Sequence, residues 1–449
     1  MAKQPSTQAY DFSRKSAGAR ATRNAAALGA ALHFDVVTCV MIAVLLVTGY
    51  LVLPPLYSVV QTSLFTTRLT GEIDQFTLQY YRNLLTELRV LGPLLNTLYF
   101  SLGASLLATL LGGSVAWFVT RTDAPLRGLG YFTAFASFGT PFILYTIGWL
   151  LLLGKAGPIN SWLKAWLDQS GPVINVYSLL GMIFIESLLW SPFVFLMLAA
   201  AFRSMDPSLE EASAVCGARL WQTMRRVSLR LMLPAFFSVV LLIFIRSFES
   251  FEIPALVGLP GDIRVLTTSI YLDAQKLPPQ YGNAGAFSVL LMFMVAATLY
   301  LYFRITREGD RFHTVTGKGY RPAVIHLGRW RYLAASGLFL YSVVLLVLPF
   351  LIILWASLLP FYIQPSFEAL GKFTLKNYIT ALHFPKITDS IKNSILLGLG
   401  SASAVMVIIL RMKASLAGTL RPARLPRQGE WVRLRKRVPA RCEAELALR

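Results

Sequence analysis

Eight long apolar runs, each with few or no charged residues, are the feature that most constrains how this chain can fold. A helix needs about 20 apolar residues to cross a bilayer core that is about 30 Å thick. The runs cover residues 36–64, 95–119, 129–153, 179–201, 234–256, 285–303, 334–358 and 393–410. The chain is therefore predicted to be an all-α, polytopic membrane protein with about eight transmembrane helices.

The composition supports this prediction. Hydrophobic residues make up 55% of the 449 residues and charged residues only 14%, whereas soluble domains average about 45–50% and about 25%. Cys39, Cys216 and Cys442 are too few and too scattered for a disulfide-stabilised scaffold. The first run lies too far from the amino terminus, and is too long, to be a cleaved signal peptide, so it is expected to remain as a helix.

The net charge of +20 is explained by where the basic residues lie between the runs. With the amino terminus in the cytoplasm, 30 of the 42 Lys and Arg residues fall in cytoplasmic segments and 11 outside, and Arg246 lies within a run. Cytoplasmic loops of membrane proteins carry such an excess. The basicity therefore indicates topology rather than nucleic-acid binding, and it predicts a cytoplasmic amino-terminal segment at residues 1–35.

One sequence pattern occurs twice, about 297 residues apart. FTLQYY at Phe76–Tyr81 returns as FTLKNY at Phe373–Tyr378, and VLPPL at Val52–Leu56 returns as VLPFL at Val347–Leu351. Six runs separate the copies, an even number, so the two halves should have the same orientation and pack about an axis along the membrane normal. The predicted parts are a first half with six spans at 36–305, a cytoplasmic linker at 306–333 and the start of a second half with two spans at 334–410.

The second copy is expected to be incomplete. Residues 411–449 contain eleven basic residues, three prolines and no further apolar run. Two interpretations are open. The segment is either a basic tail at the cytoplasmic membrane surface, attracted to anionic lipid, or an out-of-frame or truncated end of the second half.

The predicted cytoplasmic loop at 203–235 is the most informative stretch. Asp206 is a good helix cap, Pro207 suits the first helical position, and Glu210 and Glu211 lie near the positive end of the helix dipole. Gly217 is predicted to end this short helix. After it, apolar residues at helical spacing indicate an amphipathic helix that leads into the membrane. The apolar stripe comprises Leu220, Met224, Val227 and Leu231, and the polar faces comprise Arg219, Gln222, Arg225, Arg226 and Arg230.

This loop resembles that of the permease subunits of binding-protein-dependent ATP-binding-cassette importers. Their signature is Glu-Ala-Ala, three residues, Gly, nine residues, Ile, one residue and Leu-Pro. Its positions are matched by Glu211, Ala212, Ser213, Gly217, Val227 and Leu229. Arg230 replaces the proline, and a Leu-Pro follows four residues later at Leu233 and Pro234.

The resemblance implies that the short helix is a coupling helix, which docks into a cleft of a separate, dimeric cytoplasmic ATP-binding subunit. VTGKGY at Val315–Tyr320 lacks the Ser or Thr of a phosphate loop after Lys318. ATP hydrolysis is therefore expected on the separate subunit, and this chain is expected to be a transport subunit without a cofactor. The alternative is an interfacial helix that only anchors the loop among lipid headgroups.

The same resemblance implies a multi-pass protein of the bacterial inner membrane that works with a periplasmic substrate-binding protein. A second permease chain is a further candidate partner. Three stretches resemble the ferric-iron branch, in which two permease halves are fused into one chain: 249–261 (ESFEIPALVGLPG), 314–322 (TVTGKGYRP) and 327–331 (LGRWR). The resemblance implies ferric iron as cargo, while relatives of similar layout carry thiamine, polyamines, phosphonates or sulfate.

Metal ligands are not grouped in the sequence. The four histidines, which are His33, His313, His326 and His383, show no paired spacing for a metal site. Recognition of iron is therefore expected mainly on the binding protein rather than on this chain.

Ionisable residues within the predicted spans mark a second candidate site. Arg246, Glu249 and Glu252 follow one another at intervals of three in the fifth run, and Glu186 in the fourth run is a candidate partner of Arg246. A charge in hydrocarbon costs about 2.5–3.5 kcal/mol even on insertion scales, so these groups should face protein or water. They are expected to line a translocation pathway, to mark a hinge near Pro254, or to form a structural ion pair between Arg246 and Glu249.

Two other functional classes fit the sequence less well. A secondary transporter needs an ion-coupling site near the midplane, usually with broken helices in matching positions of both halves. A membrane-embedded enzyme needs an acid, base or nucleophile set that converges at one depth. The sequence therefore predicts a permease driven by a separate ATPase, with an ion-coupled secondary transporter as the alternative.

Overall fold

The computed structural model describes residues 36–67, 73–86, 90–168, 171–205, 208–218, 220–309 and 325–419. Within these residues, eight helices are long and apolar enough to cross a membrane. This confirms the predicted all-α membrane protein with eight spans. The predicted amino-terminal segment 1–35, the stretch 314–322 and the part of the basic tail after residue 419 lie outside the described residues.

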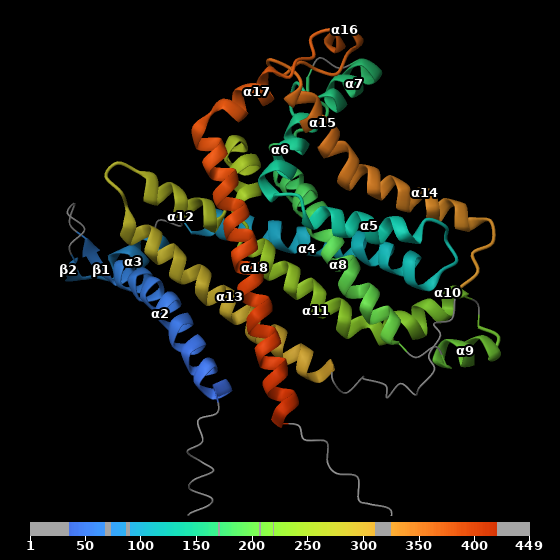
Figure 1. Cartoon of the computed structure of the whole chain (residues 1–449), viewed down its shortest axis with the longest axis horizontal. Coiled ribbons are helices and arrows are strands. Elements are labelled where there is room, and N and C mark those ends of the chain that lie inside the picture. Colours follow the sequence, from blue (N-terminus) through green and yellow to red (C-terminus); the bar gives the residue numbers. More distant parts are fainter. Residues whose placement is uncertain are drawn as a thin grey trace, which may run out of the picture. The chain divides into compact units, whose positions relative to one another are not determined.

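The elements follow one another along the chain as shown in Figure 1. They are α2 Val36–Leu64, β1 Phe65–Thr67, β2 Ile73–Phe76, α3 Gln79–Thr86, α4 Leu91–Arg121, α5 Arg127–Phe138, α6 Phe142–Leu153, α7 Pro158–Leu167, α8 Leu179–Ser204, α9 Ser208–Val215, α10 Leu220–Thr223, η1 Met224–Ser228, α11 Leu229–Phe248, η2 Pro254–Gly258, η3 Leu259–Gly261, α12 Leu266–Gln275, α13 Tyr281–Gly309, α14 Trp330–Ser342, η5 Val343–Val347, α15 Leu348–Ser357, α16 Phe367–Leu370, α17 Lys376–His383 and α18 Pro385–Thr419. β1 and β2 form an antiparallel pair.

Internal contacts divide the chain into two units, one of Met1–Pro54 with Ala381–Arg449 and one of Pro55–Thr380. In the first unit, nearly all described side chains of α2 and α18 are exposed. Long apolar helices with bare surfaces are suited to contact with lipid. The second unit contains the buried core and is the part that positions the candidate sites.

Close packing of α4 against α8 forms the centre of the second unit (Figure 1). Small residues recur every four positions on the buried face of α4, at Ala104, Ala108, Gly112 and Ala116. A Cβ atom at Gly112 would lie 2.8 Å from the backbone nitrogen of Phe195 on α8. Transmembrane helices associate through such close backbone approach, because lipid offers no hydrophobic driving force between them.

The third predicted run, 129–153, was wrong as a single helix. α5 ends at Phe138 and α6 begins at Phe142, because Pro141 has no amide hydrogen and disfavours helical geometry at the residue before it. The candidate span instead comprises Phe142–Leu167.

The fifth predicted run, 234–256, was too long at its carboxyl end. α11 ends at Phe248, and Pro254 begins the separate π-helical turn η2. Glu249 caps the end of α11, and Glu252 lies beyond the helix. The acidic residues of this stretch therefore occupy the bend after the span and not its interior.

The two copies of the repeated motif form the same local structure. Thr77 and Thr374 each accept a hydrogen bond through Oγ1 from the amide two residues later, at 3.1 Å in both copies. The hydroxyls of Tyr81 and Tyr378 lie 2.8 and 2.7 Å from a serine hydroxyl near the end of the preceding span. The repeat seen in the sequence is therefore also a repeat of contacts.

Candidate functional site

The short helix predicted in the 203–235 loop is present as α9. Gly217 follows it with φ of +79°, in the left-handed region that favours glycine. The amide of Ala218 donates to the carbonyl of Ser213 at 3.1 Å and closes the helix end. The prediction that Gly217 ends the helix is thus confirmed. Asp206 and Pro207, the predicted cap and first residue, lie outside the described residues.

The amphipathic segment after Gly217 is present as α10, η1 and the start of α11. Its apolar stripe faces the protein and its arginines face outward. Met224, Val227 and Leu231 are half-buried, whereas Gln222, Arg225, Arg226 and Arg230 are exposed. Arg219 and the side chain of Leu220 lie outside the described residues. Where it is described, the predicted pattern is confirmed.

Three side chains connect α9 to the ends of two spans, and we call Arg121, Glu210 and Ser228 the α9 brace. Ser228 donates a hydrogen bond to Glu210 Oε1 at 2.6 Å. Arg121 Nη2 lies 3.4 Å from the same oxygen. The side chain of Arg121 is only 2% exposed, and its Nε, Nη1 and Nη2 have no hydrogen-bond partner among the described residues. A buried guanidinium with one acidic neighbour should hold that neighbour strongly.

A second contact ties α9 to α10. The hydroxyls of Ser213 and Thr223 lie 2.9 Å apart. Together with the α9 brace, this contact attaches α9 to the end of α4 and to the segment that becomes α11. The helix is therefore fixed to the spans at more than one point.

The last turn of α9, by contrast, is exposed. Val215 is 89% exposed, and Ala212, Cys216 and Gly217 are also exposed. Of the other residues predicted for this site, Leu233 is exposed and Pro234 lies inside α11, whereas the side chain of Glu211 lies outside the described residues. Glu210 and Ser213, by contrast, contact the rest of the α9 brace and Thr223 from inside.

The segment that holds Arg121 is also bonded to the end of the linker, just before the second half begins. We call residues 121–123 with 325–327 the linker clamp. The amide of Ile325 donates to the carbonyl of Arg121 at 2.9 Å, and Asp123 donates back through its amide at 3.1 Å. Asp123 Oδ1 accepts from the amide of Leu327 at 2.9 Å, and Oδ2 lies 3.2 Å from His326 Nδ1. The Leu327 amide above all, and His326, hold the pKa of Asp123 below its usual value.

The ionisable residues predicted within the spans line one cavity of about 180 Å³, which brings Glu186, Arg246, Glu249 and Glu252 together. Glu186 is buried and accepts hydrogen bonds from Trp190 at 3.0 Å and from Ser250 at 3.1 Å. Arg246 Nη1 lies 3.6 Å from Glu249 Oε2. Among the described residues Arg246 thus pairs with Glu249, as in the structural ion pair considered from the sequence, and not with Glu186, the second candidate partner.

Sequence patterns did not identify Arg121, Ser228 or Trp190. Arg121 and Ser228 each act through a partner on another element, and short motifs carry no signal for such pairs, whereas Trp190 donates to Glu186 one turn earlier in α8. Within the described residues, no group of three or more His, Cys, Asp or Glu side chains could hold a metal ion.

Residues 91–306 match the family described as "Binding-protein-dependent transport system inner membrane component". The part of the chain from α4 into α13 is therefore similar to this permease family. The family is described as a component of the inner membrane, and the described residues of this chain contain eight candidate membrane spans. The matched residues include the α9 brace, the α9 helix and the acidic cavity.

The chain is similar to several curated proteins. "Putative ferric transport system permease protein FbpB 1" of Haemophilus influenzae is 29% identical over 256 residues, which cover 57% of this chain and 40% of that protein. "Ferric transport system permease protein FbpB" of Actinobacillus pleuropneumoniae is 29% identical over 234 residues, which cover 51% and 33%. "Sulfate transport system permease protein CysW" of Escherichia coli is 31% identical over 189 residues, which cover 42% and 62%. The chain therefore spans less than half the length of the two ferric relatives.

One solved structure supports the fold alone. A chain of the complex described as "bacterial alginate ABC transporter in complex with alginate pentasaccharide-bound periplasmic protein" aligns with a TM-score of 0.50 at 17% identity. The alignment covers 61% of this chain and 94% of that chain.

Proposed function

We propose that this chain is a permease, the membrane-spanning subunit of an ATP-driven, binding-protein-dependent importer, and that α9 docks into the cytoplasmic ATP-binding subunit. The observation that carries the proposal is the contrast within α9. Its last turn exposes Val215, while Glu210 and Ser213 are held from inside. An exposed apolar surface on a fixed helix is suited to contact with another protein.

The contacts of α9 can transmit a movement of this helix to the spans. A displacement of α9 moves the end of α4 through Arg121 and the start of α11 through Ser228 and Thr223. Packed helices respond to such displacements by shifting as rigid elements rather than by deforming. Closure of the ATP-binding subunit around α9 would therefore move two spans of the second unit together.

The proposal includes partners on both sides of the membrane. On the cytoplasmic side, a dimeric ATP-binding subunit offers two equivalent clefts, so we include a second permease chain that supplies the other docking helix. On the opposite side, a periplasmic binding protein delivers the cargo. The predicted cytoplasmic amino terminus, which rests on the distribution of basic residues, is consistent with α9 facing the ATP-binding subunit.

The proposed cargo is ferric iron. Two relatives carry that name, and the cavity beside α8 and α11 brings three carboxyl groups together with one guanidinium. An excess of carboxyl groups favours a cationic cargo and repels an oxyanion such as sulfate. Thiamine and polyamines are cationic alternatives that the same cavity would accept, and phosphonates and sulfate are disfavoured.

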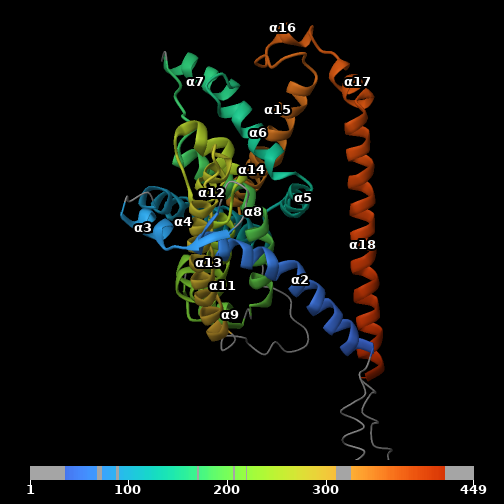
Figure 2. The same ribbon diagram turned by 90° about the vertical axis from the view of Figure 1, so that its left-hand side faces the viewer.

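Crosslinking through Cys216 tests the docking. Cys216 is exposed, and replacing Cys39 and Cys442 by Ser leaves it as the single thiol. A bifunctional thiol reagent should then join the permease to a co-expressed ATP-binding subunit. The matched control carries Cys216→Ser and Ser161→Cys, because α7 and α9 lie at opposite ends of the second unit (Figure 2). Equal crosslinking of both variants, or of neither, would contradict the docking.

Uptake into proteoliposomes tests the cargo. With the ATP-binding subunit and the binding protein present, uptake of radiolabelled ferric iron should exceed uptake of sulfate or thiamine. Glu249→Gln with Glu252→Gln should reduce iron uptake and leave crosslinking at Cys216 unchanged. Uptake of sulfate without iron would overturn the cargo and leave the docking proposal standing.

A further inference from the structure

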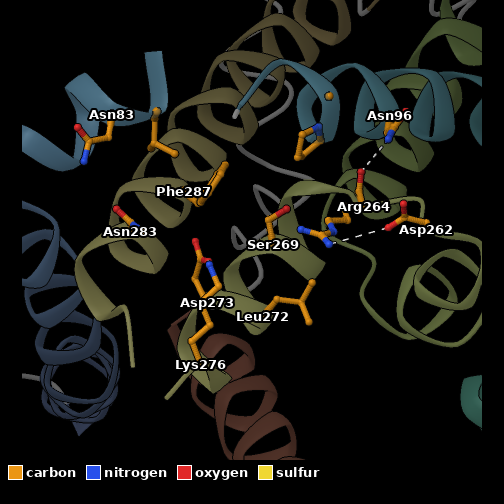
Figure 3. A pocket seen from close by; sticks show the side chains of 13 residues that line it. Asn83, Asn96, Asp262, Arg264, Ser269, Leu272, Asp273, Lys276, Asn283 and Phe287 are labelled. Atoms are coloured by element: carbon orange, nitrogen blue, oxygen red, sulfur yellow. Dashed lines mark hydrogen bonds and ion pairs between the residues drawn. The ribbon is translucent and has the colours of Figure 1, made fainter. Parts of the chain in front are cut away.

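A second, larger cavity of about 570 Å³ lies among α3, α4, α12 and α13, in the second unit (Figure 3). α4 and α13 both begin there, and α11 ends nearby, so the cavity lies at the opposite ends of the spans from α9. One face of α12 forms a wall, because Ser269, Asp273 and Lys276 are spaced four and three residues apart and all line the cavity. No role proposed above involves this cavity.

The first turn of α4 opens onto the cavity. Gly92 and Pro93 line it, and no atom lies within 4 Å of the place where a Gly92 side chain would begin. The amides of Leu91 and Gly92 have no hydrogen-bond partner among the described residues, whereas Pro93 has no amide hydrogen and Leu94 donates to the carbonyl of Val90 at 2.9 Å. Val90 at the capping position has no side-chain oxygen to offer these amides. α4 is 31 residues long, and the start of such a helix carries a partial positive charge that favours anions.

Ser269 provides an independent indication of a ligand. The residue is only 8% exposed, lines the cavity and has no hydrogen-bond partner for its Oγ among the described residues. A buried hydroxyl without a partner costs free energy. Its hydroxyl can donate to an anionic oxygen held in the cavity.

Two described cations, Lys276 and Arg264, line the cavity, and Arg264 is the one available to a ligand. Asp273 accepts from Lys276 Nζ at 2.6 Å, so these two charges neutralise each other. Arg264 Nη2 lies 3.9 Å from Asp262 Oδ1, and both side chains are largely exposed, at 60% and 93%. Such a loose exposed pair contributes little, so the Arg264 guanidinium is free to turn to another acceptor.

Arg264 also lies close to the start of α4. Asn96 donates through Nδ2 to the carbonyl of Arg264 at 2.9 Å (Figure 3), and the amide of Leu266 donates to Thr97 Oγ1 at 2.9 Å. These two bonds hold the backbone before α12 against the first turns of α4. The helix start, the guanidinium and the Ser269 hydroxyl thus border the same cavity.

We infer that this cavity binds a phosphate group, held by the amides of Leu91 and Gly92 at the start of α4, the Arg264 guanidinium and the Ser269 hydroxyl. Guanidinium and helix-start amides are the donors that bind phosphate most readily. The phosphate belongs either to a free phosphate ion or to the headgroup of an anionic phospholipid. Both sources present the same oxygens to the same donors.

Binding of inorganic phosphate to the full chain tests the inference. In nanodiscs of phosphatidylcholine, calorimetry should detect saturable phosphate binding. Arg264→Gln and Ser269→Ala should each weaken it by about tenfold, as expected for the loss of a hydrogen bond to a charged group. Arg329→Gln is the matched control, since that exposed arginine lies beyond the cavity and should leave binding unchanged.

A second measurement, in a different lipid, distinguishes a free phosphate ion from a phospholipid headgroup. If phosphate binding persists in nanodiscs of phosphatidylglycerol, the ligand is a free phosphate ion, and if the anionic lipid abolishes it, the ligand is a lipid headgroup. Either result supports the site. Absence of phosphate binding in phosphatidylcholine, or equal binding by the wild type and Arg264→Gln, would overturn it. Because Arg264 is exposed, its variant should fold even if Ser269→Ala does not, and neither result depends on transport.

Discussion

Arg121 Nη2 at the end of α4 lies 3.4 Å from Glu210 Oε1 in α9, and the two side chains are only 2% and 11% exposed. A buried ion pair is costly to break on one side, because the remaining charge is left without a partner. This pair connects the helix proposed to dock the ATP-binding subunit with α4, which packs closely against α8.

Glu210→Gln should therefore destabilise the permease and uncouple α9. Removing one partner of a buried pair costs about 3–5 kcal/mol, and the lower end applies because Ser228 can still donate to the amide oxygen. Thermal unfolding of the purified permease should shift to lower temperature, and stimulation of the ATP-binding subunit should fall. An unchanged unfolding temperature would show that the pair contributes nothing.

The double variant Arg121→Met with Glu210→Leu provides the control for this prediction. Replacing both charges by apolar side chains of similar size leaves no unpaired charge and is often neutral for stability. Stability should return, whereas coupling should stay low if the ion pair itself transmits force. Recovery of both would show that packing alone connects α9 to α4.

Gly217 offers a test of backbone geometry at the end of α9. Its φ of +79° strains any residue with a β-branched side chain, and no atom lies within 4 Å of an added Cβ. Gly217→Asn should therefore be tolerated, since Asn adopts this region more readily, and Gly217→Val should cost about 1–3 kcal/mol locally. Crosslinking at Cys216 should persist in the Asn variant and fall in the Val variant. Equal loss in both variants would indicate a side-chain contact in the docked state instead.

Local patterns were sufficient to predict α9 and the amphipathic segment after it. A helix stop at Gly217 and an apolar stripe at Met224, Val227 and Leu231 act over a few residues, so their signal is contained in the sequence nearby. The break before α6 was also encoded locally, at Gly139 and Pro141, but the apolar run on both sides concealed it. Hydropathy reports where a chain is apolar and not where its helices bend.

The contacts within the sites could not be predicted in the same way. Arg121 finds Glu210 only when α4 and the loop after α8 are brought together, and nothing near either residue in the sequence indicates the other. Glu186, Arg246, Glu249 and Glu252 were predicted as one group, and they do share a cavity. Their pairing depends on where α11 ends. Glu249 caps the helix directly after Phe248 and therefore remains within reach of Arg246.

A substitution at Gly112 tests the close packing of α4 against α8. An added Cβ would meet the backbone of α8, with Phe195 N at 2.8 Å, so Gly112→Ala should destabilise the permease by about 1–3 kcal/mol through overpacking. Gly337→Ala in α14 is the matched control, because nothing lies within 4 Å there and Ala favours a helix by about 1 kcal/mol over Gly. Thermal unfolding should therefore move in opposite directions for the two variants. A shift in the same direction would contradict the close approach of α4 and α8.

Acid should weaken the linker clamp. The Leu327 amide and His326 hold the pKa of Asp123 below its usual value, whereas the same carboxyl group in the unfolded chain should have a pKa of about 3.9. A carboxylate with a lower pKa in the folded state stabilises the fold above the unfolded pKa. That contribution is lost as pH falls through the folded value. Thermal unfolding followed from about pH 6 to about pH 3 should therefore show a decline that is smaller in Asp123→Asn.

The exposed Asp389 provides the control for the acid prediction, because Asp389→Asn removes a carboxylate from α18 without touching the clamp. That variant should follow the wild-type decline. If Asp123→Asn also follows it, the clamp does not respond to acid. If instead the unfolding temperature of Asp123→Asn stays constant over the pH range where that of the wild type declines, Asp123 must be ionised to hold Leu327. The start of the second half is then attached to the segment that carries Arg121 by a charge-dependent contact.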